Sequence, residues 1–478
     1  MKEGTRNEGR RDLLLLASLF AVALAVRVGY VLVLDVPIFD PWRHLALIRN
    51  VREGAGFTLF AGQPYIWYAS LWYRLCALFP ASVGPEWIAA FFSALTVPLV
   101  ALLAADPARK GGRAPAIVAA ALTAFAGPMV AYTCHYGQEA LALFLVVAAL
   151  LLGRAPRGMG GALAAGFVFG AGVALRMNFA FLGLLFLPVL RTRRRALALA
   201  LGLVLPLAIL WFHNHRVIAD HPFVFTWDGL ATRSSDYGPL STLVVQMHPA
   251  VQEGLSRLHE AIMPHPEWVR DQDGYHGDRI VFVATGLLCL VAGRRWSLLA
   301  CGILTLGYFF FLDGSGSSRF FRLYLPLFPV FFLAVGEVVG RMRRSARRPV
   351  RLAAWGLAAL PVVAGARLLD PPEMTPLDML VPPAGTLTAD HCLVNSGFYR
   401  PCCLIYRYPD VAFAGLPLDP AQFAAFHRAF PQYRFVLWNP MGSVQEDLFR
   451  HLATRSDFVT ERSVRNAFGV PFHVLRER

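Results

Sequence analysis

The sequence predicts a multi-pass α-helical membrane protein with about eleven transmembrane helices and a small C-terminal α/β domain. Hydrophobic residues make up 56% of the 478 residues and charged residues only 16%, against about 25% charged in soluble domains. The hydrophobic residues gather in stretches long enough to cross a bilayer, and arginines cluster between those stretches. Together these observations exclude a disordered chain, a fibrous repeat and a soluble globular enzyme.

The transmembrane spans are placed by apolar length. Lipid offers the backbone no hydrogen bonds, so a crossing segment must be a helix that satisfies its own backbone groups. Each helix needs about 20 apolar residues. On this basis we predict spans at 13–34, 86–104, 114–131, 138–153, 161–175, 177–190, 196–212, 280–293, 296–312, 319–340 and 352–369.

The distribution of charge predicts the orientation. The net charge is +14, but the exterior loop 213–279 carries 5 Arg against 9 Asp and Glu. A nucleic-acid-binding protein would instead gather its basic residues on a soluble domain, so we expect no nucleic-acid partner. The positive-inside rule places every basic run, and therefore the N-terminus, on the cytoplasmic side of a plasma (inner) membrane. The basic runs are 6–11, 109–113, 154–157, 191–195, 294–295 and 341–351.

With this orientation the loops 35–85 and 213–279 and the tail lie outside the cytoplasm. We predict a membrane domain at 1–369 and an extracytoplasmic α/β domain at 370–478, whose short β-like runs alternate with a helix-like stretch. The first exterior loop begins with an amphipathic helix that starts near Asp40 and ends near Gly54. The segment 64–80 is apolar and aromatic, and we expect a helix that lies on the membrane surface.

Asp40 is the first candidate for chemistry. It follows the first span, and a carboxylate at the membrane border can take a proton from an acceptor. The alternative is a helix N-cap with no chemical role, because Asp40 is followed by Pro41. His44 lies one turn further on and could complete a metal site. In the tail, Cys392 could form a disulfide with Cys402 or Cys403 outside the cytoplasm.

The start of the chain resembles the GT-C membrane glycosyltransferases. The resemblance rests on the run 27–30, on Asp40, on 45–57 and on the Pro- and Tyr-rich 64–68. More narrowly, these segments resemble the bacterial relatives of protein O-mannosyltransferases and of lipid A aminoarabinose transferases. In that family the first exterior loop opens with an acidic residue, usually within Asp-Glu, where this chain has Asp-Pro. The Asp-Pro-Trp sequence resembles catalytic subunits of oligosaccharyltransferases, but their Trp-Trp-Asp-Tyr-Gly motif is absent from this sequence.

Further segments resemble the same family in the same order. The run 135–141 resembles the second acidic position, with Glu139 where Asp is commoner; a glutamate favoured by the dipole of a helix N-terminus is the alternative reading. The segment 211–225 resembles an Arg-Asn-Tyr-Arg segment that opens a large exterior loop. The run 319–326 resembles an Arg-Tyr-Leu-Leu-Pro signature.

Four arginines are candidates for binding a donor phosphate. Guanidinium groups bind phosphate oxygens bidentately, and a charge at membrane depth is expensive unless it has a role. The alternative is that these arginines extend their charged ends to the interface. The four are Arg176, Arg216, Arg319 and Arg322.

The resemblance implies an inverting glycosyltransferase that moves a sugar from a polyprenyl-phosphate donor to an extracytoplasmic lipid, glycan or protein. Asp40 and Glu139 would be the catalytic residues, and membrane lipids would surround the enzyme. We expect no cofactor. One alternative is an oligosaccharyltransferase-like enzyme that binds a divalent metal through Asp40, His44 and Glu139. The other is a transporter or flippase for lipid-linked sugars, which would usually show internal repeats.

Overall fold

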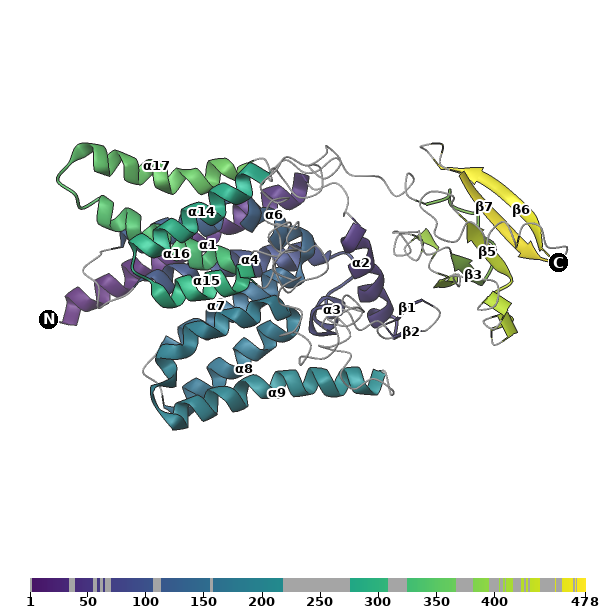
Figure 1. The fold of residues 1–478 in the computed structure, drawn as a ribbon, viewed down its shortest axis with the longest axis horizontal. Helices are drawn as coiled ribbons and strands as arrows, with labels where there is room; N and C mark the ends of the chain where they lie inside the picture. The colour runs from purple at the N-terminus through teal and green to yellow at the C-terminus, as the bar shows by residue number, and fades with distance from the viewer. Residues whose placement is uncertain are drawn as a thin grey trace, which may run out of the picture. The chain divides into compact units, whose positions relative to one another are not determined.

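The computed structural model describes two compact units, which are drawn together in Figure 1. The first comprises residues 1–34, 67–72 and 82–372, and the second residues 35–66, 73–81 and 373–478. The described residues are 2–33, 39–54, 58–60, 63–64, 70–105, 113–154, 158–217, 276–307, 325–366, 381–394, 404, 407–408, 410–415, 423–424, 427–428, 430–438, 452, 458–466, 469 and 471–478.

The first unit is helical, and every predicted span overlaps at least one of its helices. Two features give these helices their limits: apolar stretches in their interiors, and Pro, Gly or Arg near their ends. They are α1 (Lys2–Val33), α4 (Pro85–Ala104), α5 (Ala114–Phe125), α6 (Gly127–Tyr136), α7 (Gln138–Arg154), α8 (Met159–Leu175), η1 (Met177–Arg191), α9 (Arg193–Val217), α14 (His276–Ala292), α15 (Trp296–Gly307), α16 (Leu327–Met342) and α17 (Arg348–Ala364).

Two described helices are long and apolar enough to cross a membrane, Asp12–Val33 within α1 and Pro85–Ala104. The bent pair of α5 and α6 would add a third. Several others are apolar but shorter, among them α8 (Met159–Leu175). The segment predicted as the span 177–190 is the 3₁₀ helix η1, which is unusually long for a helix type that rarely exceeds four residues.

The helix of the predicted span 114–131 is broken at Ala126. The axes of α5 and α6 differ by 51°, and Ala126 has extended dihedral angles (φ −66°, ψ 124°). Pro128, at the start of α6, has no N–H to continue the α5 hydrogen bonds. Gly127 permits a close approach of Gly365, since a Cβ on Gly127 would lie 1.7 Å from the Gly365 carbonyl oxygen.

Small residues let α8 and α9 approach closely. A Cβ on Gly166 would lie 2.1 Å from the carbonyl oxygen of Leu199, and one on Gly202 would lie 2.2 Å from that of Leu163. Small residues at helix interfaces are typical of membrane proteins, where dispersion forces between closely packed backbones hold helices together. Gly336 of α16 packs against Pro115 of α5 in the same way.

The second unit begins with α2 (Phe39–Arg52) and the short antiparallel pair of β1 (Thr58–Phe60) and β2 (Gln63–Pro64). Leu47 and Ile48 of α2 are buried, whereas Arg52 is exposed. The sequence predicts an apolar stripe of Trp42, Leu45, Ile48 and Val51 on this helix. Ile48 is buried as predicted, but Leu45 and Val51 are only half-buried, and the buried Leu47 lies outside the stripe. Within the predicted surface segment 64–80, the described helix is α3 (Ser70–Ala77).

The C-terminal part of the second unit contains a five-stranded sheet in the order β4-β3-β5-β7-β6. The strand β3 pairs in parallel with β4 and β5, while β7 is antiparallel to β5 and β6. A buried cluster that includes Leu393, Trp438 and Phe458 packs on it. The strands are β3 (His391–Val394), β4 (Ala412–Gly415), β5 (Phe435–Trp438), β6 (Phe458–Arg465) and β7 (Pro471–Glu477).

Candidate functional site

The junction between α6 and α7 places Glu139 in the first turn of a buried helix. Gly137 separates the two helices with φ 58° and ψ −64°, a backbone conformation that residues other than glycine rarely adopt. There is also no room for a side chain, because a Cβ on Gly137 would lie 2.4 Å from Cζ2 of the buried Trp72. The chain therefore restarts as a helix at Gln138, and the helix dipole favours the Glu139 carboxylate.

Glu139 forms an ion pair with Arg176. An Nη of Arg176 donates a hydrogen bond to Oε1 of Glu139. The Glu139 side chain is 3% exposed and that of Arg176 is 18% exposed, so water screens this pair only weakly. Arg176 has extended dihedral angles between α8 and η1 (φ −150°, ψ 105°). The break between those two helices is thus the point from which the guanidinium reaches α7.

Two of the residues predicted to act at the site are therefore brought together, although 37 positions separate them in the sequence. Ionisable groups buried inside a membrane domain are rare and usually functional. The pairing also neutralises the Arg176 charge locally, which the sequence does not reveal.

Four buried polar atoms of this ion pair and of the adjacent Gln138 make no hydrogen bond among the described residues. They are Oε2 of Glu139, Nε of Arg176 (whose Nη binds Glu139) and both amide atoms of Gln138, Oε1 and Nε2. Gln138 is fully buried and Glu139 is 2% exposed. Buried polar groups are nearly always hydrogen-bonded, so each exception needs an explanation. The sequence motifs do not indicate a role for Gln138. Its position immediately before a candidate acid is the one feature that could have drawn attention to it.

Arg27 forms a second buried polar network, at the break between α5 and α6. Its guanidinium donates hydrogen bonds to the carbonyl oxygens of Thr123 (2.9 Å) and Ala124 (3.1 Å) and to Oγ of Ser93 (2.5 Å). Those carbonyls belong to the last turn of α5, where four acceptors lack helical partners. In the sequence, Arg27 is notable only as part of the run 27–30 that resembles GT-C glycosyltransferases, and its structural role is not predicted. An arginine inside an apolar span is the signal that could have identified its role.

The other predicted site residues lie where the structure does not describe their side chains. Asp40 is the second residue of α2, and His44 lies in the same helix. Arg216 is in the last turn of α9. Arg319 and Arg322 lie outside the described residues, before α16. Among the side chains that the structure describes, which do not include those of Asp40 and His44, no three metal-ligating groups gather.

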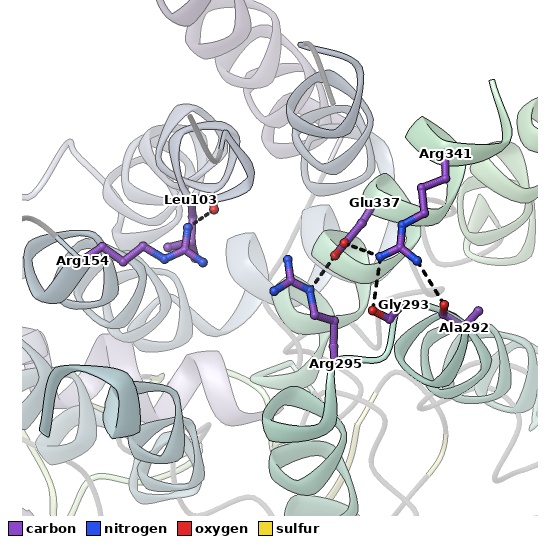
Figure 2. A network of polar contacts seen from close by, with 7 residues as sticks. All are labelled: Leu103, Arg154, Ala292, Gly293, Arg295, Glu337 and Arg341. Atoms are coloured by element: carbon purple, nitrogen blue, oxygen red, sulfur yellow. Dashed lines mark hydrogen bonds and ion pairs between the residues drawn. The ribbon is translucent and has the colours of Figure 1, made fainter. Parts of the chain in front are cut away.

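An arginine–glutamate network joins three helices at a predicted cytoplasmic end. Glu337 accepts a hydrogen bond from Nε of Arg295 and another from an Nη of Arg341, both at 2.6 Å. Arg341 also donates to the carbonyl oxygens of Ala292 (3.2 Å) and Gly293 (3.3 Å). Figure 2 shows these contacts, which connect α14, the start of α15 and α16. The network therefore stabilises these helix ends. From the sequence, its arginines are predicted only to set the orientation of the protein in the membrane.

Two further arginines of the basic runs bind neighbouring elements. Arg154, at the end of α7, donates to the carbonyl oxygen of Leu103 in α4 (Figure 2). Arg113 forms an ion pair with Asp12 at 2.6 Å, with both side chains more than half exposed. An exposed pair of this kind adds at most about 1 kcal/mol to stability.

The predicted disulfide of Cys392 is wrong. Cys392 lies on β3 as a free, fully buried thiol, and its Sγ donates a weak hydrogen bond to the carbonyl oxygen of Leu393 at 3.4 Å. Burial raises the pKa of this thiol from 9.0 to about 12. The side chain therefore behaves as a small apolar residue of the sheet.

Comparisons with known proteins identify a common fold. No family model and no curated protein sequence matches the chain. Among solved structures, the chain is similar to ArnT from Cupriavidus metallidurans bound to undecaprenyl phosphate, with a TM-score of 0.53, 12% identity and coverage of 96% of this chain and 97% of that one. The apo structure of the same protein gives a TM-score of 0.54 and 13% identity at the same coverage.

ArnT is a lipid A aminoarabinose transferase of the GT-C superfamily. The resemblance that the sequence motifs indicate is therefore confirmed at the level of the fold, over nearly the whole of both chains. The chain therefore shares the fold of ArnT over nearly the whole length of both proteins.

Proposed function

We propose that the protein is a membrane glycosyltransferase that moves a sugar from a polyprenyl-phosphate donor to an extracytoplasmic acceptor. The observation that carries the proposal is the shared fold with a transferase that was crystallised with undecaprenyl phosphate. A buried Glu139–Arg176 pair inside the helical unit supports it, because intramembrane ion pairs usually serve a substrate path.

In the proposed reaction Asp40 acts as the general base. It would remove a proton from an acceptor hydroxyl or amine, which then attacks the anomeric carbon from the face opposite the phosphate. The configuration at that carbon would invert, and the polyprenyl phosphate would leave. The leaving phosphate gains charge in the transition state, so fixed guanidinium groups accelerate the step as well as bind the donor. Arg319, Arg322 and Arg216 are the arginines that we assign to it, and Glu139 with Arg176 completes the set of residues at the donor.

The proposed topology has eleven crossings, a cytoplasmic N-terminus and an extracytoplasmic C-terminal domain in the plasma (inner) membrane. Reporter fusions test it directly. Fusions after Leu34, within 220–275 and after Asp370 should report an exterior location, and fusions at 109, 193 and 345 an interior one. A cytoplasmic C-terminal domain would contradict the assignment of the active site to the exterior face.

The activity is tested with purified protein and undecaprenyl-phosphate-linked sugars. Incubation with envelope lipids, glycans and proteins should release undecaprenyl phosphate and give a glycosylated acceptor that mass spectrometry detects. A chelator should leave the rate unchanged, since no step requires a metal; inhibition would favour the oligosaccharyltransferase-like alternative. Movement of the lipid-linked sugar across vesicle membranes without transfer would favour a flippase.

A further inference from the structure

The proposed roles leave Gln138 without a function, although its burial is costly. This side chain is fully buried in the first turn of α7, and neither its amide oxygen nor its amide nitrogen has a hydrogen-bond partner among the described residues. An amide in a dry environment loses its hydrogen bonds to water and gains nothing in return. A methionine or leucine of similar volume would avoid that cost, so packing alone does not account for a glutamine.

The next residue, Glu139, has one carboxylate oxygen with a hydrogen-bond partner and one without. Its Oε1 accepts from Arg176, but its Oε2 is buried and has no donor among the described side chains and backbone groups. The cluster of Gln138 and Glu139 thus offers two acceptor oxygens, Oε1 of Gln138 and Oε2 of Glu139, and the two N–H donors of the amide. These groups form a set that is complementary to a ligand carrying both donors and acceptors.

The charge of the cluster selects among ligands. Glu139 and Arg176 are paired, so their charges cancel and the cluster has no net positive charge to attract a phosphate. An unpaired carboxylate oxygen repels a phosphate oxygen and attracts an O–H or N–H donor. Sugar rings carry hydroxyl or amino groups that donate, together with oxygen atoms that accept. A phosphate carries mainly acceptors.

We infer that Gln138, together with Oε2 of Glu139, binds the sugar ring of the donor and contributes to sugar specificity. This inference rests on the proposed function, because it takes a lipid-linked sugar as the ligand. The inference adds Gln138, which the sequence motifs do not indicate, to the donor site. It also divides that site into a sugar-binding part and a phosphate-binding part. The sugar is bound by the neutral cluster at the start of α7, and the phosphate by the remaining arginines. Sites that hydrogen-bond a substrate discriminate strongly against analogues without those groups.

The test compares the binding of bare and glycosylated lipids to wild-type protein and two variants. The probes are bare undecaprenyl phosphate and undecaprenyl phosphate that carries mannose, glucose or 4-amino-4-deoxyarabinose. The variant is Gln138→Met, which keeps the approximate volume and removes the amide. The matched control is Thr96→Val in α4, because Thr96 is also fully buried but its hydroxyl donates to the Phe92 carbonyl oxygen of its own helix at 2.9 Å. Binding is measured in detergent by microscale thermophoresis, and thermal unfolding is recorded without ligand.

We expect wild-type protein to bind one glycosylated lipid more tightly than the bare lipid. Gln138→Met should weaken binding of that lipid by roughly tenfold to a hundredfold, the effect of one or two lost hydrogen bonds. It should leave binding of bare undecaprenyl phosphate unchanged. Its melting temperature without ligand should equal or exceed that of wild type, because two unsatisfied polar atoms are gone. Thr96→Val should bind both lipids as wild type does.

Three results would overturn the inference. One is a Gln138→Met protein with the wild-type preference for the glycosylated lipid, which would mean that the amide binds only water. Another is an equal loss of both lipids together with a lower melting temperature, which would make Gln138 a structural residue. The third is a wild-type protein that binds bare undecaprenyl phosphate but prefers none of the three glycosylated forms. Wild-type protein that binds no polyprenyl phosphate at all would instead refute the proposed function, and the inference with it.

Discussion

Nε of Arg27 donates a hydrogen bond to Oγ of Ser93 over 2.5 Å, and this contact joins α1 to α4 inside the helical unit. The Ser93 hydroxyl lies 2.7 Å from Oγ1 of Thr133, so the connection continues to α6. Through the carbonyls of Thr123 and Ala124 the same guanidinium also binds the end of α5. A single side chain thus holds four helices at the point where α5 and α6 separate.

Arg27→Met should destabilise the helical unit strongly. The substitution keeps the apolar stem but leaves buried carbonyl oxygens without a donor, and each orphaned acceptor costs about 1–3 kcal/mol. We expect a loss of about 3 kcal/mol in total, visible as a lower melting temperature of the purified protein in detergent. Arg27→Lys should be intermediate, because an ammonium group cannot bind Ser93, Thr123 and Ala124 together in the planar geometry of a guanidinium. If Arg27→Met melted at the same temperature as wild type, the Arg27 hydrogen bonds would not stabilise the junction between α5 and α6.

Gly137→Ala should damage the site more than the same change elsewhere. The added Cβ would lie 2.4 Å from the Trp72 side chain, and the alanine would have to adopt φ 58°. The start of α7 must therefore move. We expect a loss of roughly 1–3 kcal/mol in stability and a larger relative loss of sugar transfer, since Glu139 moves with the helix. The control is Gly160→Ala in α8, where a Cβ meets nothing within 4 Å; its melting temperature and activity should stay at wild-type values or rise slightly. Equal behaviour of the two variants would contradict the role of Gly137.

Asp40→Asn should abolish most of the activity and leave the fold intact. Asparagine keeps nearly the size and shape of the Asp40 side chain in the first turn of α2, so α2 should form, while the amide cannot accept a proton. The rate of sugar transfer should fall by about 10²–10⁴, the usual effect of losing a general base. Size-exclusion profiles should match those of wild type. The exposed Asp390 provides the control, because Asp390→Asn should transfer sugar normally. Normal turnover by Asp40→Asn would show that Asp40 does not act as the general base.

Arg319→Ala should lower sugar transfer, and Arg319→Lys should lower it less. Lysine keeps the charge but not the bidentate geometry that suits a phosphate. The loss in kcat should be about tenfold for lysine and about a hundredfold or more for alanine. Kinetics with a saturating lipid-linked donor would measure both.

The control for Arg319 is Arg351→Ala on α17, where the side chain is exposed. Arg341, also in a predicted cytoplasmic run, is unsuitable because it binds Glu337, Ala292 and Gly293. Arg341→Ala should therefore lower the melting temperature without a direct effect on chemistry. If Arg319→Ala transfers sugar normally while Arg351→Ala does not, the donor phosphate has been assigned to the wrong side of the membrane.

The Cys392 thiol should resist alkylation in the folded protein. Its pKa is about 12 in the fold against 9.0 for an ordinary thiol, so the folded state retains a proton that the unfolded state loses. The corresponding stability is fully present below pH 9 and is lost as the pH rises toward 12. At pH 8.5 we expect no iodoacetamide adduct on Cys392 in native protein and full labelling in urea, as measured by mass spectrometry. Rapid labelling of native protein would show that the thiol is accessible.

The helical membrane class, the positions of the apolar segments and the candidate acid Glu139 at the start of a helix can all be predicted from the sequence. These are local properties. Hydropathy accumulates over some twenty consecutive residues, and a glycine followed by an acidic residue indicates a helix start within a few positions. The motif order in the chain also sufficed to indicate the GT-C fold, which the structure comparison confirms.

Which of these groups contact one another depends on how the separate helices pack. Arg176 pairs with Glu139 across 37 positions of sequence, and Arg27 reaches Ala124 across 97. The break of the predicted span at Ala126 likewise depends on distant groups, Arg27 for its carbonyls and Gly365 for its close packing. Local hydropathy treats Pro128 and a buried arginine as minor interruptions of an apolar run. Their consequences follow from hydrogen bonds and contacts that form only when separate helices pack side by side.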